Sequence, residues 1–396
     1  MSSEPRRRQG QKKSVGLVPR LRFPEFQEAG EWEERELGDL CDICTGRKDA
    51  NEGSPNGQYP FFTCADQHSF SDTYSYDAEA ILIAGNAHVG QTRYYKGKFE
   101  AYQRTYVLTG FRNIYTSYLF AFLGATLQAS LSAQAQTSAM SYIRLPMLKG
   151  YNVIYPHNAN EQKKIADCLS SLDDLITLES RKLDALKQHK RGLMQQLFPA
   201  EGETVPRLRF PEFREAGEWH AKSLGELCNI LNNRRKPITS TERKAGEYPY
   251  YGASGIVDYI DDYIFDEELL LIGEDGAKWG AYEASSFIVY EKCWVNNHAH
   301  VLKPLGVDIK IVEAYLNMKD LNTYVTGAAP PKLTLGKLKE ILVPVPPSVE
   351  EQVKIASTLY ITDGLITAQR KKIESLKTHK KGLMQQLFPA LDDAVA

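Results

Sequence analysis

The chain contains two copies of one frame. The segment VPRLRFPEFQEAGEW at 18–32 returns as VPRLRFPEFREAGEW at 205–219, with 14 of 15 positions identical. The segment HKRGLMQQLFPA at 189–200 likewise returns as HKKGLMQQLFPA at 379–390. The stretches between these copies have diverged widely. A constant frame around two divergent inserts favours a protein that makes one kind of contact twice while it recognises two different things.

Each divergent insert, about 33–155 and 220–345, has the pattern of a compact α+β domain. Short β-branched and aromatic runs separated by Gly, Asn and Asp predict strands joined by long loops. The predicted strands are Tyr59–Thr63, Ala80–Ala84 and Thr105–Leu108 in the first insert, and Tyr248–Tyr251, Leu269–Ile272 and Ser286–Tyr290 in the second. Helices are expected near 117–132 and 308–322, and closing strands at Val153–Pro156 and Val343–Pro346.

A long helix is predicted after each closing strand. Apolar residues recur there at alternating steps of four and three, which is the heptad pattern of helices that pack along a seam. The seam residues are Ile165, Leu169, Leu172, Ile176, Leu183, Leu186 and Leu193 in the first helix, and Ile355, Leu359, Ile366, Ile373, Leu376 and Leu383 in the second. Even the polar interruptions coincide, Glu179 with Gln369 and Lys190 with Lys380. Each helix of about 37 residues is ~55 Å long.

Two such helices in one chain are expected to pack on each other, antiparallel. The predicted fold is therefore α+β, with two globular domains joined by two long antiparallel spacer helices and related by a pseudo-two-fold internal repeat. We expect the two domains at opposite ends of the helix pair. An oligomerising coiled coil between chains is the alternative that this pattern leaves open.

Composition places limits on location and partners. The net charge is −2, and the two inserts contain 10 basic and 12 acidic, and 14 basic and 17 acidic residues, so any nucleic-acid surface depends on local asymmetry. No apolar run approaches the ~20 residues of a membrane span. The basic N-terminus, 1–17, lacks the apolar core of a secretory signal and is predicted to be a disordered arm.

The six cysteines are scattered, as is typical of reduced cytosolic thiols, and a cytoplasmic location without a membrane is expected. Cys41 and Cys44 have the spacing of a metal or redox pair. The second copy has Cys228 and Leu231 at the matching positions, so we predict buried apolar positions instead.

The chain resembles the specificity subunit of Type I restriction-modification enzymes over about 16–390. The resemblance rests on the closing pattern at Lys339–Ile355 with its counterpart Lys149–Ile165, on the two Gly-Leu-Met-Gln-Gln-Leu-Phe-Pro ends, and on Tyr248–Gly252 and Leu270–Gly276. The first insert departs from the last two motifs, with Phe62-Thr63-Cys64 and Ile83–His88 in their place. Divergence between the inserts fits two different target half-sites.

The resemblance implies a non-catalytic DNA-binding subunit for a bipartite target. Its domains would be the arm at 1–17, target recognition domains at 18–156 and 205–346, a central repeat helix at 157–204, and a C-terminal helix and tail at 347–396. The implied partners are double-stranded DNA, two modification (methyltransferase) subunits and the restriction subunits. S-adenosylmethionine, ATP and Mg would bind those partners, with no cofactor in this chain. A non-DNA scaffold, or the specificity subunit of a methylation-only or Type IIB-like system, remains the alternative.

Catalytic motifs are absent from the sequence. The nearest match to an Asn-Pro-Pro-aromatic methyltransferase loop is Ala329–Lys332, which lacks both the amide and the aromatic residue, and no phosphate-binding loop occurs. Glu274, Asp275 and Lys278 are only a weak match to a nuclease triad. His298 and His300 have strand spacing without a convincing third metal ligand, so a polar strand that faces a groove or the core is favoured.

Polar and basic residues in the loops are the candidates for DNA contact, because Arg, Lys, Asn and Gln read base edges and Arg, Lys, Ser and Tyr hold phosphates. In the first insert the candidates are Arg47, Lys48, Gln91, Arg93, Tyr94, Ser141, Tyr142 and Arg144. In the second they are Asn233, Arg234, Arg235, Lys236, Lys278, Trp279 and Lys332. As a set, about half are expected to touch DNA.

Overall fold

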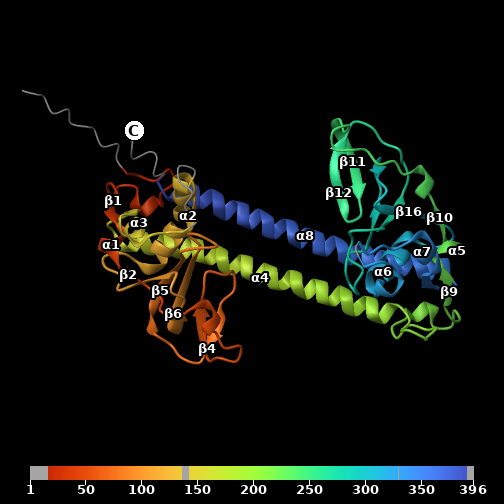
Figure 1. The fold of residues 1–396 in the computed structure, drawn as a ribbon, viewed down its shortest axis with the longest axis horizontal. Helices are drawn as coiled ribbons and strands as arrows, with labels where there is room; N and C mark the ends of the chain where they lie inside the picture. The colour runs from red at the N-terminus through yellow and green to blue at the C-terminus, as the bar shows by residue number, and fades with distance from the viewer. Residues whose placement is uncertain (1–16, 136–141, 329, 390–396) are drawn as a thin grey trace, which may run out of the picture. The chain divides into compact units, whose positions relative to one another are not determined.

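The computed structural model describes residues 17–135, 142–328 and 330–389 (Figure 1). All but the last residue of the predicted basic arm lies outside this range. The chain divides into two compact units, Met1–Leu178 with Ile373–Ala396 as unit 1, and Glu179–Lys372 as unit 2. Each unit therefore contains one divergent insert and a part of both long helices, α4 (Ala159–Leu197) and α8 (Val349–Leu387).

Unit 1 is built on a six-stranded sheet of order β2-β7-β5-β6-β3-β4. The strands are β2 (Asp42–Thr45), β3 (Tyr59–Phe62), β4 (Ser69–Ser71), β5 (Tyr76–Ala84), β6 (Thr92–Ala101) and β7 (Thr105–Thr109). A separate pair joins β1 (Glu33–Glu36) to β8 (Asn152–Tyr155). The helices are η1 (Pro24–Phe26), α1 (Leu37–Leu40), η2 (Ala50–Glu52), α2 (Thr116–Ala135) and α3 (Leu145–Lys149). Two of the predicted strands lie within β5 and β7, β3 covers the third except for Thr63, and α2 contains the predicted helix.

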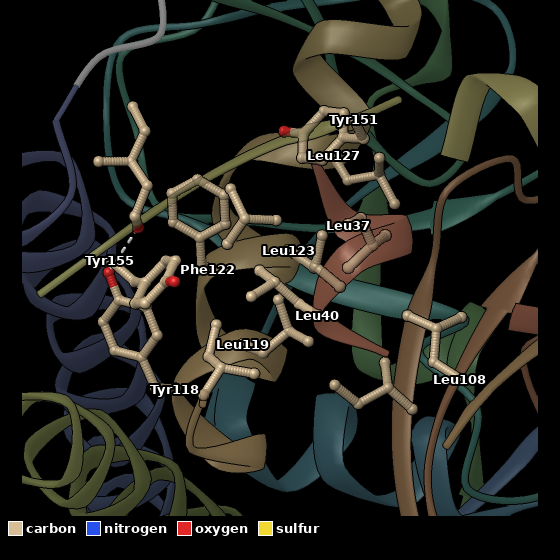
Figure 2. Close-up of a cluster of buried hydrophobic side chains, with 14 of the residues drawn as sticks. Leu37, Leu40, Leu108, Tyr118, Leu119, Phe122, Leu123, Leu127, Tyr151 and Tyr155 are labelled. Carbon is tan, nitrogen blue, oxygen red and sulfur yellow. Dashed lines mark hydrogen bonds between the residues drawn. The ribbon is translucent and has the colours of Figure 1, made fainter. Parts of the chain in front are cut away.

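The core of unit 1 lies between the sheet and α2. Figure 2 shows Tyr118 and Phe122 of α2 beside Tyr155, in one cluster that extends to Leu37 and Leu40 of α1 and Leu108 of β7. The end of α8 completes this core, because the Phe388 ring lies 5.7 Å from that of Tyr118 and 5.5 Å from that of Phe122. The end of one long helix is thus a structural part of the first globular domain.

Unit 2 has the same plan with a different sheet division. A four-stranded sheet has the order β10-β16-β13-β14, a three-stranded sheet the order β12-β11-β15, and β17 pairs with β9. The strands are β9 (His220–Ser223), β10 (Cys228–Ile230), β11 (Ala245–Gly252), β12 (Gly255–Ile260), β13 (Leu269–Gly273), β14 (Ser286–Val289), β15 (Trp294–Val295), β16 (Ala299–Pro304) and β17 (Leu342–Val345). The helices are η3 (Pro211–Phe213), α5 (Leu224–Leu227), η4 (Asn232–Arg234), α6 (Ile309–Met318), η5 (Asn322–Tyr324) and α7 (Leu335–Glu340).

The repeated lead-in motif is fastened to the start of a long helix in both units. The Arg22 guanidinium donates to both carboxylate oxygens of Glu161, at 2.7 and 2.8 Å. Arg209 and Glu351 form the same two bonds in unit 2, each at 2.8 Å. Both pairs are almost completely buried. The duplicated sequence therefore builds duplicated geometry at the base of each domain.

The two long helices pack antiparallel, as predicted. In unit 1 the Lys380 ammonium lies 2.6 Å from the Asp173 carboxylate, and in unit 2 Lys190 lies 2.5 Å from Asp363. These are the same pair of repeat positions, 190 residues apart in sequence. Every predicted seam residue is buried or half-buried, while neighbouring positions such as Asp174 are exposed.

The polar interruption of the seam also pairs with its own repeat. Gln369 donates from its side-chain amide to the backbone carbonyl of Glu179 at 2.9 Å and to its carboxylate at 2.6 Å. Lys372 lies 2.5 Å from the same carboxylate, and these contacts lower the pKa of Glu179. A polar pair at a seam position specifies register at some cost in stability.

The prediction for the cysteine pair was half wrong. Cys41 is buried, as predicted, whereas Cys44 is exposed on β2. Its thiol lies 3.7 Å from the Tyr76 hydroxyl and 3.6 Å from the Val107 carbonyl oxygen. The two cysteines differ because Cys41 follows α1 against the core, while β2 places Cys44 on the open side of its strand.

Candidate nucleic-acid interface

Each unit has the same turn at the end of a central strand. β5 leads into 85–91 in unit 1, and β13 leads into 274–278 in unit 2. Ala87 and Gly276 occupy matching positions, both in the left-handed region, with φ of 53° and 69°. That conformation favours glycine, so an alanine there indicates a turn that the surroundings impose.

A second loop is hydrogen-bonded to this turn in both units. The Ile143 N–H donates to the Gly85 carbonyl at 2.9 Å, and the Leu333 N–H donates to the Glu274 carbonyl at 2.8 Å. Ile143 and Leu333 are repeat positions that precede α3 and α7. We call the combined area, 85–91 with 142–144 or 274–278 with 330–332, the turn-and-loop surface. It includes the predicted contact residues Gln91, Tyr142 and Arg144 in unit 1, and Lys278 and Lys332 in unit 2.

Different side chains contact the second loop in the two units, each at the carbonyl oxygen of the matching residue, Ile143 or Leu333. The Tyr106 hydroxyl donates to the Ile143 carbonyl at 2.9 Å. In unit 2 His300 takes this place, with its Nε2 2.7 Å from the Leu333 carbonyl oxygen. Asn232 donates to the other ring nitrogen, Nδ1, at 2.8 Å. His300 is therefore a buried structural residue, while His298 two positions earlier is exposed beside Asp275 at 2.5 Å.

The state of His300 makes the stability of this chain sensitive to mild acid. Burial lowers the pKa of His300 below its usual value. As pH falls through about 6.5, the unfolded chain gains a proton at this residue and the folded chain does not, so stability is lost. We expect the urea midpoint to fall between about pH 8 and about pH 5.5 by more in the native chain than in His300→Gln. An equal fall in both proteins would contradict this role.

Several predicted DNA contacts in unit 2 are engaged inside the protein. The Arg235 guanidinium lies 2.5 Å from the Glu274 carboxylate and donates to the Ala299 carbonyl at 2.9 Å. Arg234 forms an ion pair with Glu267 at 2.6 Å. Trp279 is 5% exposed and donates from Nε1 to the Gly273 carbonyl at 3.2 Å. Trp279 is thus a core residue in this structure, and we omit it from the proposed interface.

Other predicted residues of unit 2 are on the surface. Asn233, Lys236 and Lys278 are exposed, and their side chains form no hydrogen bond or ion pair within the described part of the chain. The Lys332 side chain is 45% exposed, and its ammonium lies 2.7 Å from the Glu274 carboxylate. Burial alone would raise the pKa of Glu274, but hydrogen bonds from Arg235 and Lys332 outweigh it and lower the pKa. Lys332 is therefore exposed to solvent while its ammonium is held by Glu274.

A groove of about 550 Å³ opens beside the turn of unit 2. It lies between the β11–β12 hairpin and the segment 296–298 that joins β15 to β16. Its polar lining includes Arg243, Ser254, Asp275, Asn297 and His298. Sequence reasoning did not select Arg243 or Asn297 for DNA contact. The Asn296-Asn297 pair was a usable signal, because amide side chains read adenine edges.

The predicted DNA contacts of unit 1 also divide into side chains engaged within the protein and side chains on the surface. Lys48 donates to Ser71 at 2.9 Å and to Thr73 at 2.7 Å, which fixes its ammonium within the domain. Arg93 donates to the Ala65 carbonyl, and its buried Nη1 has no partner among the described residues. Gln91 lies 3.3 Å from Asp66. Arg47 and Arg144 are exposed, and Arg144 stacks over Tyr142 at 5.6 Å.

Two of the predicted DNA contacts of unit 1, Tyr94 and Ser141, are not placed with the residues above. Tyr94 projects to the opposite face of β6 from Arg93, because successive strand residues alternate. It donates to Glu79 at 2.8 Å, and burial together with that carboxylate raises the pKa of Tyr94 to about 12. Ser141 lies outside the described residues.

The described residues contain no group of three or more His, Cys, Asp or Glu side chains placed to hold a metal ion. Nor does any helix within 17–135, 142–328 and 330–389 have the length and apolar character to cross a membrane.

Comparison with known proteins gives consistent matches. A family profile described as the Type I restriction modification DNA specificity domain matches residues 29–188 and 216–378. A Haemophilus influenzae protein, described as a type I restriction enzyme specificity subunit, is 38% identical over 148 residues. The Type I restriction enzyme EcoDI specificity subunit of Escherichia coli is 33% identical over 231 residues. These alignments cover 37% and 52% of this chain, and the chain spans 38% and 51% of those relatives.

Solved structures agree on the fold. The S subunit of a Type I restriction-modification system from M. genitalium has a TM-score of 0.65 at 19% identity, over 95% of this chain and 100% of that one. A chain from a structure on complex assembly and conformational transition of the type I R-M system has a TM-score of 0.53 at 14% identity, over 91% of this chain and 98% of that one. With the family profile matched in both halves, the chain belongs to the Type I restriction-modification DNA specificity family and carries two copies of its domain.

Proposed function

We propose that this chain recognises a bipartite DNA sequence and recruits two methyltransferase subunits and the restriction subunits of a Type I system. One observation carries the proposal: the same turn-and-loop surface occurs in both units, on one duplicated frame, with different side chains. Two unlike surfaces on one frame suit a target with two unlike half-sites. The chain itself would supply recognition, with methyl transfer and cleavage performed by its partners.

Exposed cations and amides, both on the turn-and-loop surfaces and outside them, make the two units suitable for DNA. Lys236, Lys278 and Lys332 reach solvent in unit 2, as do Arg47 and Arg144 in unit 1. Such side chains hold phosphates, and amides such as those of Asn233 and Asn297 read base edges. Local concentration of these groups offsets the chain's net charge of −2.

The test combines the chain with its modification subunits, S-adenosylmethionine and genomic DNA. Methylation-sensitive sequencing is expected to find one two-part motif with a fixed gap. Asn233→Ala with Lys278→Ala is expected to relax discrimination in one half-site only. Arg47→Ala with Arg144→Ala, the matched change in unit 1, is expected to relax the other. Methylation without a two-part motif would favour a scaffold role, and methylation by the chain alone would contradict a non-catalytic role.

The long helices offer a repeated surface for the two modification subunits. Besides the seam, each helix exposes a second stripe at i, i+4 and i+7, which we call the outer stripe: Ser171, Leu175 and Leu178 in α4, and Ile361, Leu365 and Ala368 in α8. Leu178 is 59% exposed and Ile361 66% exposed. Apolar residues at this spacing form one helix face, which supports docking of a partner helix.

The outer stripe predicts a change in stoichiometry. Leu175→Glu and Leu365→Glu lie at equivalent repeat positions. Each is expected to weaken the binding of one modification subunit by about 10- to 100-fold, because burial of a leucine at an interface contributes ~1.5–3 kcal/mol. Native mass spectrometry should then find one bound copy in each single variant and none in the double variant. Thr177→Glu and Thr367→Glu, exposed on another face of the same helices, are the controls. Two bound copies in the double variant would exclude this docking surface.

A further inference from the structure

A cluster of four charges, in which Lys310 is buried and the other three are half-buried, joins the second domain to both long helices within unit 2. Lys310 of α6 has a side chain only 6% exposed, and its ammonium lies 2.6 Å from Asp363 of α8 and 2.8 Å from Glu313. The other oxygen of Asp363 accepts from Lys190 of α4 at 2.5 Å. One carboxylate therefore binds a cation from the domain and a cation from the opposite helix.

The cluster is charged at neutral pH. Burial alone would lower the pKa of Lys310, but Glu313 and Asp363 outweigh it and raise the pKa. Burial likewise would raise the pKa of Asp363, and the hydrogen bonds from Lys190 and Lys310 lower it instead. Buried ion pairs add little net stability, because desolvation offsets their attraction. What such a cluster does determine is geometry, since each charge tolerates few positions of its partner.

Unit 1 has the helix pair of this cluster, but among its described residues no domain side chain forms an ion pair with it. Asp173 and Lys380 repeat Asp363 and Lys190. One shared contact matches α2 of unit 1 with α6 of unit 2. The Tyr115 N–H, just before α2, donates to Gln162 at 2.6 Å, and the Asp308 N–H, just before α6, donates to Gln352 at 3.0 Å. Counting forward from that contact, Ser117 and Phe120 stand where unit 2 has Lys310 and Glu313. Neither residue can form the ion pairs.

A second, independent contact ties the same domain to α4. The Arg191 guanidinium lies 4.1 Å from the centre of the Tyr282 ring. Tyr282 has a φ of 64°, a left-handed conformation that a tyrosine rarely adopts. Such strain persists only where surrounding contacts impose it. The loop that carries Tyr282 is thus held against the helix in a conformation that the isolated loop would disfavour.

We propose that Lys310, together with Asp363 and Tyr282, is a positioning residue that fixes the angle of the second recognition domain on the spacer helices. This inference rests on the proposed function, because the angle matters through the gap allowed between the two half-sites. Lys310 acts through the domain it holds and does not itself touch DNA. Loss of Lys310 leaves Lys190 paired with Asp363, so the helices stay joined while the domain gains freedom.

The variant that tests the proposal is Lys310→Met with Glu313→Gln, which leaves no unpaired charge at either position. Methylation by the complex with its modification subunits is measured on DNA that contains the native half-sites with gaps altered by one or two base pairs. The ratio of rates at the native and altered gaps is expected to fall by about tenfold, since small misplacements in bound complexes have effects of that order or larger. Half-site preferences should remain native.

Two further variants separate positioning from mere folding. Lys380→Met removes the ion pair between the helices of unit 1, which no described side chain of the first domain joins, and should leave the gap ratio unchanged. Tyr282→Gly removes the ring contact and also relieves the positive φ, so it should fold and lower the gap ratio. An unchanged ratio in folded Lys310→Met with Glu313→Gln, or an equal loss in Lys380→Met, would overturn the proposal. If the native chain shows no two-part motif at all, it is the proposed function that fails.

Discussion

Replacing Glu351 by glutamine is expected to lower the free energy of unfolding by about 3 to 5 kcal/mol, the usual cost of removing one partner of a buried ion pair. The Glu351 side chain is 1% exposed and that of Arg209 6% exposed. Without the carboxylate, the guanidinium would retain its charge in a buried position opposite a neutral amide, with the Gly217 carbonyl at 2.7 Å as its other acceptor. Few changes outside the apolar core should cost as much.

Urea unfolding followed by tryptophan fluorescence measures this loss, because Trp219 lies in the core of the same unit. Glu350→Gln is the matched control, since it removes the same charge from the adjacent, exposed position of α8. That control should cost far less, as is usual for exposed charges. A loss in Glu351→Gln as small as in Glu350→Gln would show that the arginine finds other partners. Glu161→Gln should repeat the large effect in unit 1.

The frame of this fold could be predicted from sequence because its signals are periodic or duplicated. Residues such as Ile165 and Ile355 recur at heptad spacing, and that spacing indicates one packed seam whatever the partner is. The pairing of Glu179 with Gln369 was not predicted, although both were noted as interruptions of the seam. Sequence shows that two positions are polar, and only the antiparallel register shows that they meet.

The site was less predictable because residue type does not reveal a partner. Lys48 and Arg235 are as basic as Arg47 and Lys236, yet their cations are fixed within the protein by Ser71 and Glu274. Those partners lie 23 and 39 residues away in sequence. Trp279 follows the same logic, since its indole completes a core that forms only after folding. Predicting which cations remain free requires the tertiary contacts that occupy the others.

Lengthening both spacer helices by one heptad is expected to widen the gap between half-sites by about three base pairs. Seven residues add about 10 Å to a helix, and a base pair occupies ~3.4 Å of duplex. The insertion must be made beside Glu179 and beside Gln369 together, because the two seams pack against each other and a heptad preserves their register. The half-site sequences should stay native, since both turn-and-loop surfaces are untouched. Methylation-sensitive sequencing with the modification subunits reads gap and half-sites in one experiment.

Insertion of seven residues into α4 alone is the control, and it should abolish specific methylation by mismatching the seams. An unchanged gap in the matched variant would show that the helices do not set the spacing, and altered half-sites would show that they take part in reading the sequence.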